Sequence, residues 1–144
     1  MKLRRILRLG IRHFGPLCRA LGAVLAFRIA LVFFKYRQIA GKIHVQHARA
    51  GQSSEKPIVT AWAGKQAARV VPFASCLTQA LALQYLLAAN AHSSVVRVGV
   101  RTDEKNTVHA HSWVLLDDVV ILGGSSEKIK EYTVLTDLSP AFDG

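Results

Sequence analysis

The stretch that decides the fold is Ser75-Cys76-Leu77-Thr78-Gln79-Ala80-Leu81-Ala82-Leu83-Gln84-Tyr85-Leu86-Leu87-Ala88-Ala89. Leucine, alanine and glutamine, which are strong helix formers, dominate residues 76–89, and glycine and proline are absent. Ser75 is a favoured N-cap residue because its hydroxyl can accept a backbone N–H of the first turn. We therefore predict a helix over 76–89 with Cys76 in its first turn.

Beyond Asn90 the hydrophobic period changes from 3.6 to 2. Valines alternate with Arg97, Gly99 and Arg101, and two further apolar runs, 108–116 and 119–122, flank the turn Asp117-Asp118. This pattern is typical of an antiparallel meander. We expect residues 123–130 to form a loop and 132–135 to add a fourth strand.

Toward the N-terminus, Pro57 opens a predicted helix over 58–70 that ends before Pro72. Residues 43–56 are polar and turn-rich, which indicates a linker. Helices followed by strands in blocks predict an α+β domain. The expected organisation is a basic helical region 1–42, a linker 43–56 and a domain 57–144, and 144 residues suit one such domain.

The charge lies at one end of the chain. The formal net charge is +10, and residues 1–42 hold ten Lys or Arg and no acid, while the rest of the chain is balanced. Arginines on one side and large aliphatic residues on the other predict basic amphipathic helices over about 2–14 and 16–36, divided at Gly15-Pro16. Interleaved aliphatic residues argue against nucleic-acid binding.

Three arrangements of this region remain open. Arg19 and Arg28 fall inside the apolar stretch 16–34, which counts against a membrane span. The alternatives are peripheral contact with an anionic membrane and packing against the domain or a partner protein. The two cysteines, Cys18 and Cys76, lie in unlike surroundings, which favours reduced thiols and a cytoplasmic protein, membrane-associated if the peripheral alternative holds.

Cys76 and two histidines are the candidates for chemistry. The first turn of a helix favours a thiolate, because unpaired N–H groups point at it. His109 and His111 share one face of their strand, since strand side chains alternate. Each of the three also has a structural interpretation, as a buried thiol or a hydrogen-bonded core histidine. Together they allow a Cys-His nucleophilic pair.

Three segments carry a family resemblance. They are the Cys76 helix, the strand Val96-Arg97-Val98-Gly99-Val100-Arg101, and Ala110-His111-Ser112-Trp113-Val114. Together they resemble the transglutaminase-like cysteine protease of lasso-peptide biosynthesis, the B protein, in its split form that lacks a leader-recognition domain. The resemblance implies a papain-like half-barrel, in which an antiparallel sheet packs on a central helix that bears the cysteine.

The resemblance implies Cys76 as nucleophile and His111, which precedes Ser112-Trp113, as its base. The family's third residue, an aspartate on the next strand, is missing here. Pairing 116 with 119 across the turn puts His111 opposite Gly124 and near Gly123. Asp117 and Asp118 lie about 20 Å along the strand. Ser125, Glu127 or a backbone carbonyl remains to orient the imidazole.

The implied function is removal of the leader from a ribosomally made lasso-peptide precursor. Implied partners are the precursor, a separate leader-recognition protein and a lasso cyclase. The sequence shows no nucleotide-binding loop and no evident cofactor, so ATP dependence comes from the resemblance alone. Two alternatives stay open: a zinc site built from Cys76, His109 and His111, and a non-catalytic scaffold bound to a membrane or partner.

Overall fold

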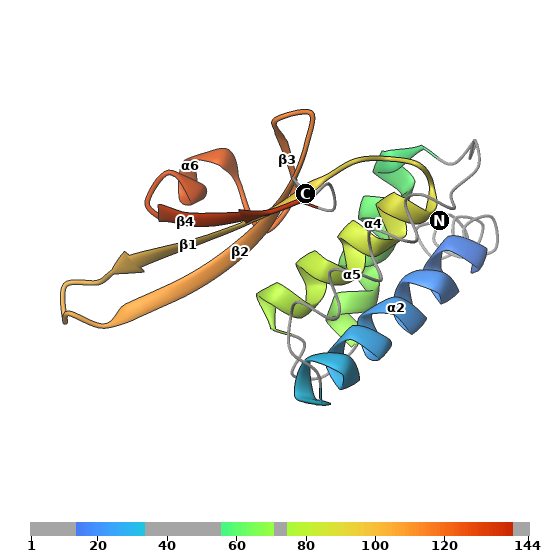
Figure 1. Ribbon diagram of the computed structural model, residues 1–144, viewed down its shortest axis with the longest axis horizontal. Helices are drawn as coiled ribbons and strands as arrows, with labels where there is room; N and C mark the ends of the chain where they lie inside the picture. Colours follow the sequence, from blue (N-terminus) through green and yellow to red (C-terminus); the bar gives the residue numbers. More distant parts are fainter. Residues whose placement is uncertain (1–13, 34–55, 71–74, 140–144) are drawn as a thin grey trace, which may run out of the picture.

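The computed structural model describes residues 14–33, 56–70 and 75–139, which form a helical layer and a sheet (Figure 1). In chain order the elements are α2 (Phe14–Phe33), α4 (Pro57–Val70), α5 (Cys76–Ala89), β1 (Val95–Thr102), β2 (Val108–Leu116), β3 (Val119–Leu122), α6 (Ser126–Ile129) and β4 (Thr133–Leu138). The strand order is β3-β2-β1-β4, and all neighbours are antiparallel. The fold is α+β, as predicted.

The three long helices pack against one another. α2 contacts both α4 and α5, and α4 contacts α5. Small side chains on α4, with Ala61, Ala63 and Ala67 all buried, let the helices approach closely. From α2, Val24 and Phe27 enter the same core. The described part of the N-terminal region is therefore built into the domain core, which is the packing alternative for residues 14–33.

α5 is the central helix, as its composition predicts. Leu81, Leu83 and Leu87 are fully buried, and apolar burial extends around most of the helix. A helix that is apolar on all sides is stable only when it is enclosed. Ser75 is its N-cap: the Ser75 hydroxyl accepts the N–H of Thr78 at 3.2 Å. The predicted boundaries, residues 76 and 89, are confirmed.

The buried side-chain amide of Gln84 links α5 to the sheet. Nε2 of Gln84 donates to the carbonyl oxygens of Ser94 at 3.1 Å and Leu138 at 2.7 Å. These two carbonyls belong to the entry of β1 and the end of β4, so the contact fixes one end of the sheet on the helix. α5 also packs against β2. These contacts determine where the β2 side chains lie relative to the helix.

Several sequence predictions are confirmed and others are corrected. Asp117 and Asp118 form the tight turn, both with positive φ. The loop expected over 123–130 contains the short helix α6, and β4 is longer and begins one residue later than expected. The helix expected over 16–36 already includes Phe14, since proline is tolerated in a first turn, where its missing N–H would have no partner. It is described to Phe33, and residues 34–36 lie outside the described residues.

Two predicted segments, the helix 2–14 (except Phe14) and the linker 43–56 (except Lys56), lie outside the described residues. Within the ranges that are described, no helix combines the length and apolarity that crossing a membrane requires.

Candidate active site

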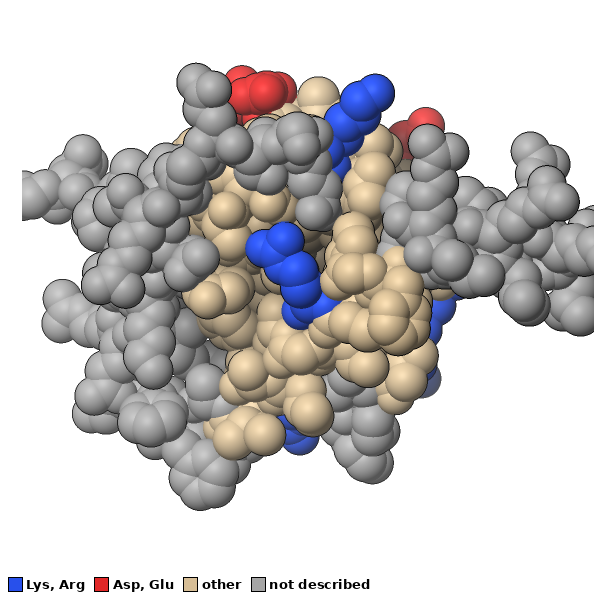
Figure 2. Space-filling view, turned by 90° about the vertical axis from the view of Figure 1, so that its right-hand side faces the viewer, with Lys and Arg blue, Asp and Glu red and all other residues tan. Residues whose placement is uncertain are grey.

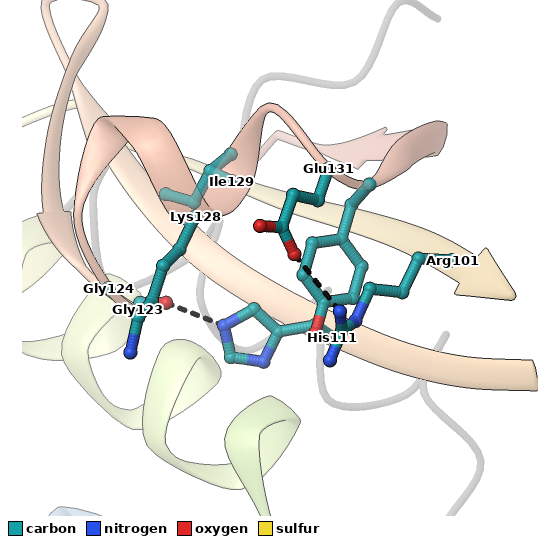
Figure 3. A pocket seen from close by; sticks show the side chains of 8 residues that line it. Arg101, His111, Gly123, Gly124, Lys128, Ile129 and Glu131 are labelled. Atoms are coloured by element: carbon teal, nitrogen blue, oxygen red, sulfur yellow. Dashed lines mark hydrogen bonds and ion pairs between the residues drawn. The ribbon is translucent and has the colours of Figure 1, made fainter. Parts of the chain in front are cut away.

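His111 is held by the main chain. It is half-buried on β2, and its Nε2 lies 2.5 Å from the carbonyl oxygen of Gly123 (Figure 3). A carbonyl oxygen can only accept a hydrogen bond, so Nε2 carries the proton. In the neutral ring the lone pair is then on Nδ1. Figure 3 shows Nδ1 on the side of the ring that faces the pale ribbon of the helical layer.

Gly123 reaches this position because the β2–β3 ladder is irregular. Leu116 pairs with Val119, as expected, but the register shifts by one between Leu115 and Val114. The chain after β3 therefore bends over β2 with Gly123 at φ +109°. A side chain at this position would place its Cβ 2.4 Å from Cβ of Trp113. Only glycine fits here.

Two aromatic rings lie beside the imidazole. The ring centroid of His111 lies 5.3 Å from that of Tyr132 and 6.1 Å from that of Trp113, and the Trp113 and Tyr132 rings are 6.2 Å apart. Trp113 is fully buried, in part because Gly99 on β1 leaves room for its ring. These contacts restrict the imidazole to one orientation.

A pocket of about 390 Å³ opens beside His111. It is lined by Arg101, His111, Gly123, Gly124, Lys128, Ile129, Glu131 and Tyr132. Arg101 pairs with Glu131 at 3.0 Å, and its guanidinium carbon lies 5.4 Å from the centre of the Tyr132 ring. The imidazole therefore borders a space with charged walls that a substrate can enter.

Cys76 lies half-buried in the first turn of α5. In Figure 1, α5 begins on the side of the sheet where the β1–β2 hairpin lies, and His111 is in the first half of β2. β3 pairs with β2 only over 114–116, so at His111 no β3 residue lies alongside. Among the described residues, no hydrogen bond joins Cys76 to His111, and Cys76 does not line the pocket.

His109 is placed apart from this site. It is exposed, and its Nε2 lies 2.8 Å from Oδ2 of Asp103. That hydrogen bond, followed by those from the backbone of Thr107 and Lys105, lowers the pKa of Asp103. Within the described ranges, Cys76, His109 and His111 do not come together as a metal-ligand group. The zinc alternative thus has no support in the geometry.

Sequence reasoning missed most of the pocket. Lys128, Glu131 and Tyr132 fall in a region expected to be a loop and the start of a strand, where no periodicity marks them. Arg101 was visible only as part of an alternating strand. The one available signal was Gly123-Gly124, since paired glycines after a strand indicate an unusual backbone path.

The comparison with protein families gives one match. A family model described as the transglutaminase-like superfamily matches residues 21–137. The match covers α4, α5 and nearly all of the sheet, and most of α2. No curated protein matches the chain, and no solved structure does.

Proposed function

The chain belongs to the transglutaminase-like superfamily, and from that premise we propose that it is a cysteine peptidase that removes the leader from a ribosomally made lasso-peptide precursor. The superfamily includes cysteine peptidases. The more specific substrate rests on the sequence around Cys76 and His111, which resembles the split B protein of lasso-peptide biosynthesis.

The observation that carries the proposal is the contact between His111 and Gly123. Because the carbonyl oxygen fixes the proton on Nε2, the lone pair of Nδ1 is available to a thiol on the helical side. The family's aspartate would orient the ring in the same way and would also place a negative charge beside it. Here the main chain supplies the orientation alone, as a neutral partner can in papain-like enzymes.

In the proposed reaction, Nδ1 of His111 takes the proton of the Cys76 thiol, and Sγ attacks the carbonyl carbon of the scissile bond. The C–N bond then breaks, His111 returns the proton to the leaving amine, and the leader remains as a thioester on Cys76. A water molecule, deprotonated by His111, hydrolyses the thioester. The free amine is the new N-terminus of the core peptide, on which a separate cyclase would act.

The start of α5 offers donors for the oxyanion. The Ser75 hydroxyl accepts the N–H of Thr78, and the Ser75 carbonyl accepts that of Gln79. The N–H groups of Cys76 and Leu77 precede these in the first turn, where helical N–H groups have no intrahelical acceptor. We propose that these two N–H groups donate hydrogen bonds to the carbonyl oxygen of the substrate and stabilise the negative charge that develops on it. We propose that Sγ and Nδ1 meet already in the free chain in solution, and that their hydrogen bond tightens when substrate binds, as catalytic hydrogen bonds often do.

We also propose that a separate protein recognises the leader. From Lys56 onward, the described residues up to 139 are accounted for by α4, α5 and the sheet with α6. Nothing in those ranges forms an additional leader-binding module. Cleavage should therefore require the precursor, this chain and a recognition protein together.

The test is cleavage of a precursor encoded beside this gene, in the presence of its recognition protein, followed by mass spectrometry. The wild-type chain should release the leader, and Cys76→Ala and His111→Ala should not. His109→Ala is the matched control, because His109 lies on the same strand but bonds Asp103. Full activity of Cys76→Ala would overturn the proposal.

A second proposal concerns the outer face of α2. Phe14, Leu21, Leu25 and Ile29 are 39–66% exposed and follow one another at helical spacing, so they form an apolar stripe. Figure 2, which views the molecule from the right-hand side of Figure 1, shows a described surface that is mostly uncharged, with Lys or Arg near its centre. We propose that this stripe contacts an anionic membrane, helped by the ten basic residues of 1–42.

A further inference from the structure

Two cationic side chains flank the imidazole of His111. Arg101 projects from the end of β1 and Lys128 from α6, and both line the pocket that His111 borders. In Figure 3 the ammonium of Lys128 lies on the side of the imidazole where the Gly123 carbonyl binds Nε2, and the guanidinium of Arg101 lies on the opposite side. Two separate elements thus bring positive charge to the place where a substrate would meet His111.

Glu131 offsets only part of this charge. Its carboxylate pairs with Arg101, which also lies over Tyr132. Lys128 has no ion pair among the described residues. Two permanent cations and one anion leave an excess of one positive charge in a space of about 390 Å³. Such a pocket favours an anionic group over a neutral one.

The wall beside these cations is open. Apart from Gly124 itself and its two chain neighbours, no described atom lies within 4 Å of the position that a Cβ on Gly124 would take. Bare backbone of this kind lets a ligand approach closely. The pocket therefore has both the charge and the room for a small planar anion.

We propose that this pocket binds a carboxylate of the substrate or product, supplied either by an Asp or Glu side chain close to the scissile bond or by the free C-terminus that cleavage gives to the leader. The inference rests on the proposed peptidase function, for which it names a specificity determinant. A carboxylate in this pocket can accept a hydrogen bond from Lys128 and is attracted by the charge of Arg101, whereas an amide in the same place would leave the Lys128 charge without a partner.

The test is a binding titration on the full chain carrying Cys76→Ala. Binding is monitored through the backbone amide NMR signals of Gly123, Gly124 and Lys128. The probes are N-acetyl-glutamate N-methylamide, its glutamine counterpart, and N-acetyl-alanine with a free carboxylate. We expect at least one carboxylate probe to bind about tenfold more tightly than the glutamine probe, equal to about 1.4 kcal/mol. Whichever carboxylate probe binds better identifies the source.

Paired variants locate the effect. Lys128→Gln should weaken binding of the better carboxylate probe about tenfold. Lys130→Gln is the matched control, since Lys130 is exposed, nearby and outside the pocket lining, and it should bind as the parent does. Glu131→Gln should strengthen binding, because it removes the competing anion.

Equal binding of the glutamate and glutamine probes, or equal losses in Lys128→Gln and Lys130→Gln, would overturn the inference. Because the titration uses an inactive chain, it does not depend on cleavage. Cleavage of precursors without regard to charge would refute this specificity and leave the peptidase function standing. Selective carboxylate binding by a chain that cleaves nothing would refute the function instead.

Discussion

His111 takes its orientation from the main chain of Gly123, whose carbonyl oxygen lies 2.5 Å from Nε2. A carboxylate in that position would both fix the tautomer and stabilise the protonated ring, whereas a carbonyl oxygen fixes the tautomer without adding a charge. Gly123 is thus a positioning residue, and the glycine is required by its φ of +109° and by its closeness to Trp113.

Gly123→Ala should destabilise the fold and release the imidazole. The new Cβ would overlap Trp113 in a backbone conformation that alanine avoids, at a cost of about 2–4 kcal/mol in the free energy of unfolding. Denaturant titration measures that loss. Imidazole ¹⁵N shifts measure the tautomer, which should be Nε2–H in the wild type and a mixture in the variant.

Gly124→Ala is the matched control. Its φ is also positive, at +125°, but outside its two chain neighbours no described atom lies within 4 Å of its new Cβ. The free energy of unfolding of this variant should fall only by the cost of the backbone strain, about 1–2 kcal/mol. Its His111 should keep the Nε2–H tautomer. If the two variants gave the same loss and the same tautomer, the role assigned to Gly123 would be wrong.

Ser75→Ala should weaken the start of the helix that carries Cys76. The Ser75 hydroxyl accepts the N–H of Thr78 and lies 2.9 Å from its hydroxyl. Removing an N-cap of a long, buried helix costs about 1 kcal/mol of unfolding free energy. Ser125→Ala, at the cap of the four-residue α6, should cost clearly less. Thermal denaturation of both variants compares the two, and an equal loss would contradict the central role of α5.

The pairing of Arg97 with Asp137 should make stability depend on pH. Two hydrogen bonds, at 2.6 and 2.7 Å, join the side chains and lower the pKa of Asp137, the bond from Arg97 being the largest cause. A carboxyl whose pKa is lowered by folding contributes stability above its unfolded pKa, near 3.9, and loses it as the pH falls through the lower folded value.

Asp137→Asn should therefore reduce the free energy of unfolding by about 0.5–1 kcal/mol near neutral pH, since the pair is partly exposed. The difference from wild type should shrink as the pH falls below 4. Urea titrations across that range measure it. A difference that stayed constant with pH would show that the charge of Asp137 contributes nothing.

Elements with strong local signals could be predicted from the sequence. Residues 76–89 combine a capping serine with helix-forming side chains, so both ends were predictable. The Asp117-Asp118 turn follows from two apolar strands separated by two turn residues. The positive φ of both aspartates confirms the hairpin. In these places local preference and tertiary packing agree.

The rest depends on contacts that are distant in sequence. The register shifts beside Gly99 and Val114 bend β4 and the segment after β3, and no local residue pattern specifies them. The same holds for the candidate site. His111 could be predicted from its sequence motif, and its closeness to Gly123 could be predicted from the Asp117-Asp118 turn. The contact between His111 and Tyr132 could not be predicted, because it depends on the register shifts.

The apolar stripe of α2 predicts membrane binding that depends on salt. The full chain should sediment with anionic vesicles at low salt and be released at high salt, because the attraction decays over about 8 Å at physiological ionic strength. Leu25→Glu, in the stripe, should reduce binding. Val119→Glu, at an exposed β3 position, adds the same charge elsewhere and should not. Equal binding by all three chains would contradict the proposal.

The central claim is that His111 activates the thiol of Cys76, and the alkylation rate of Cys76 tests it most directly. The measurement uses iodoacetamide near neutral pH. Every chain compared, the parent included, carries Cys18→Ser, because Cys18 is exposed and would also react. The account predicts rapid alkylation with His111 in place and a rate at least about tenfold lower in His111→Ala, while His109→Ala reacts as the parent does. Equal rates in the parent and His111→Ala would contradict it.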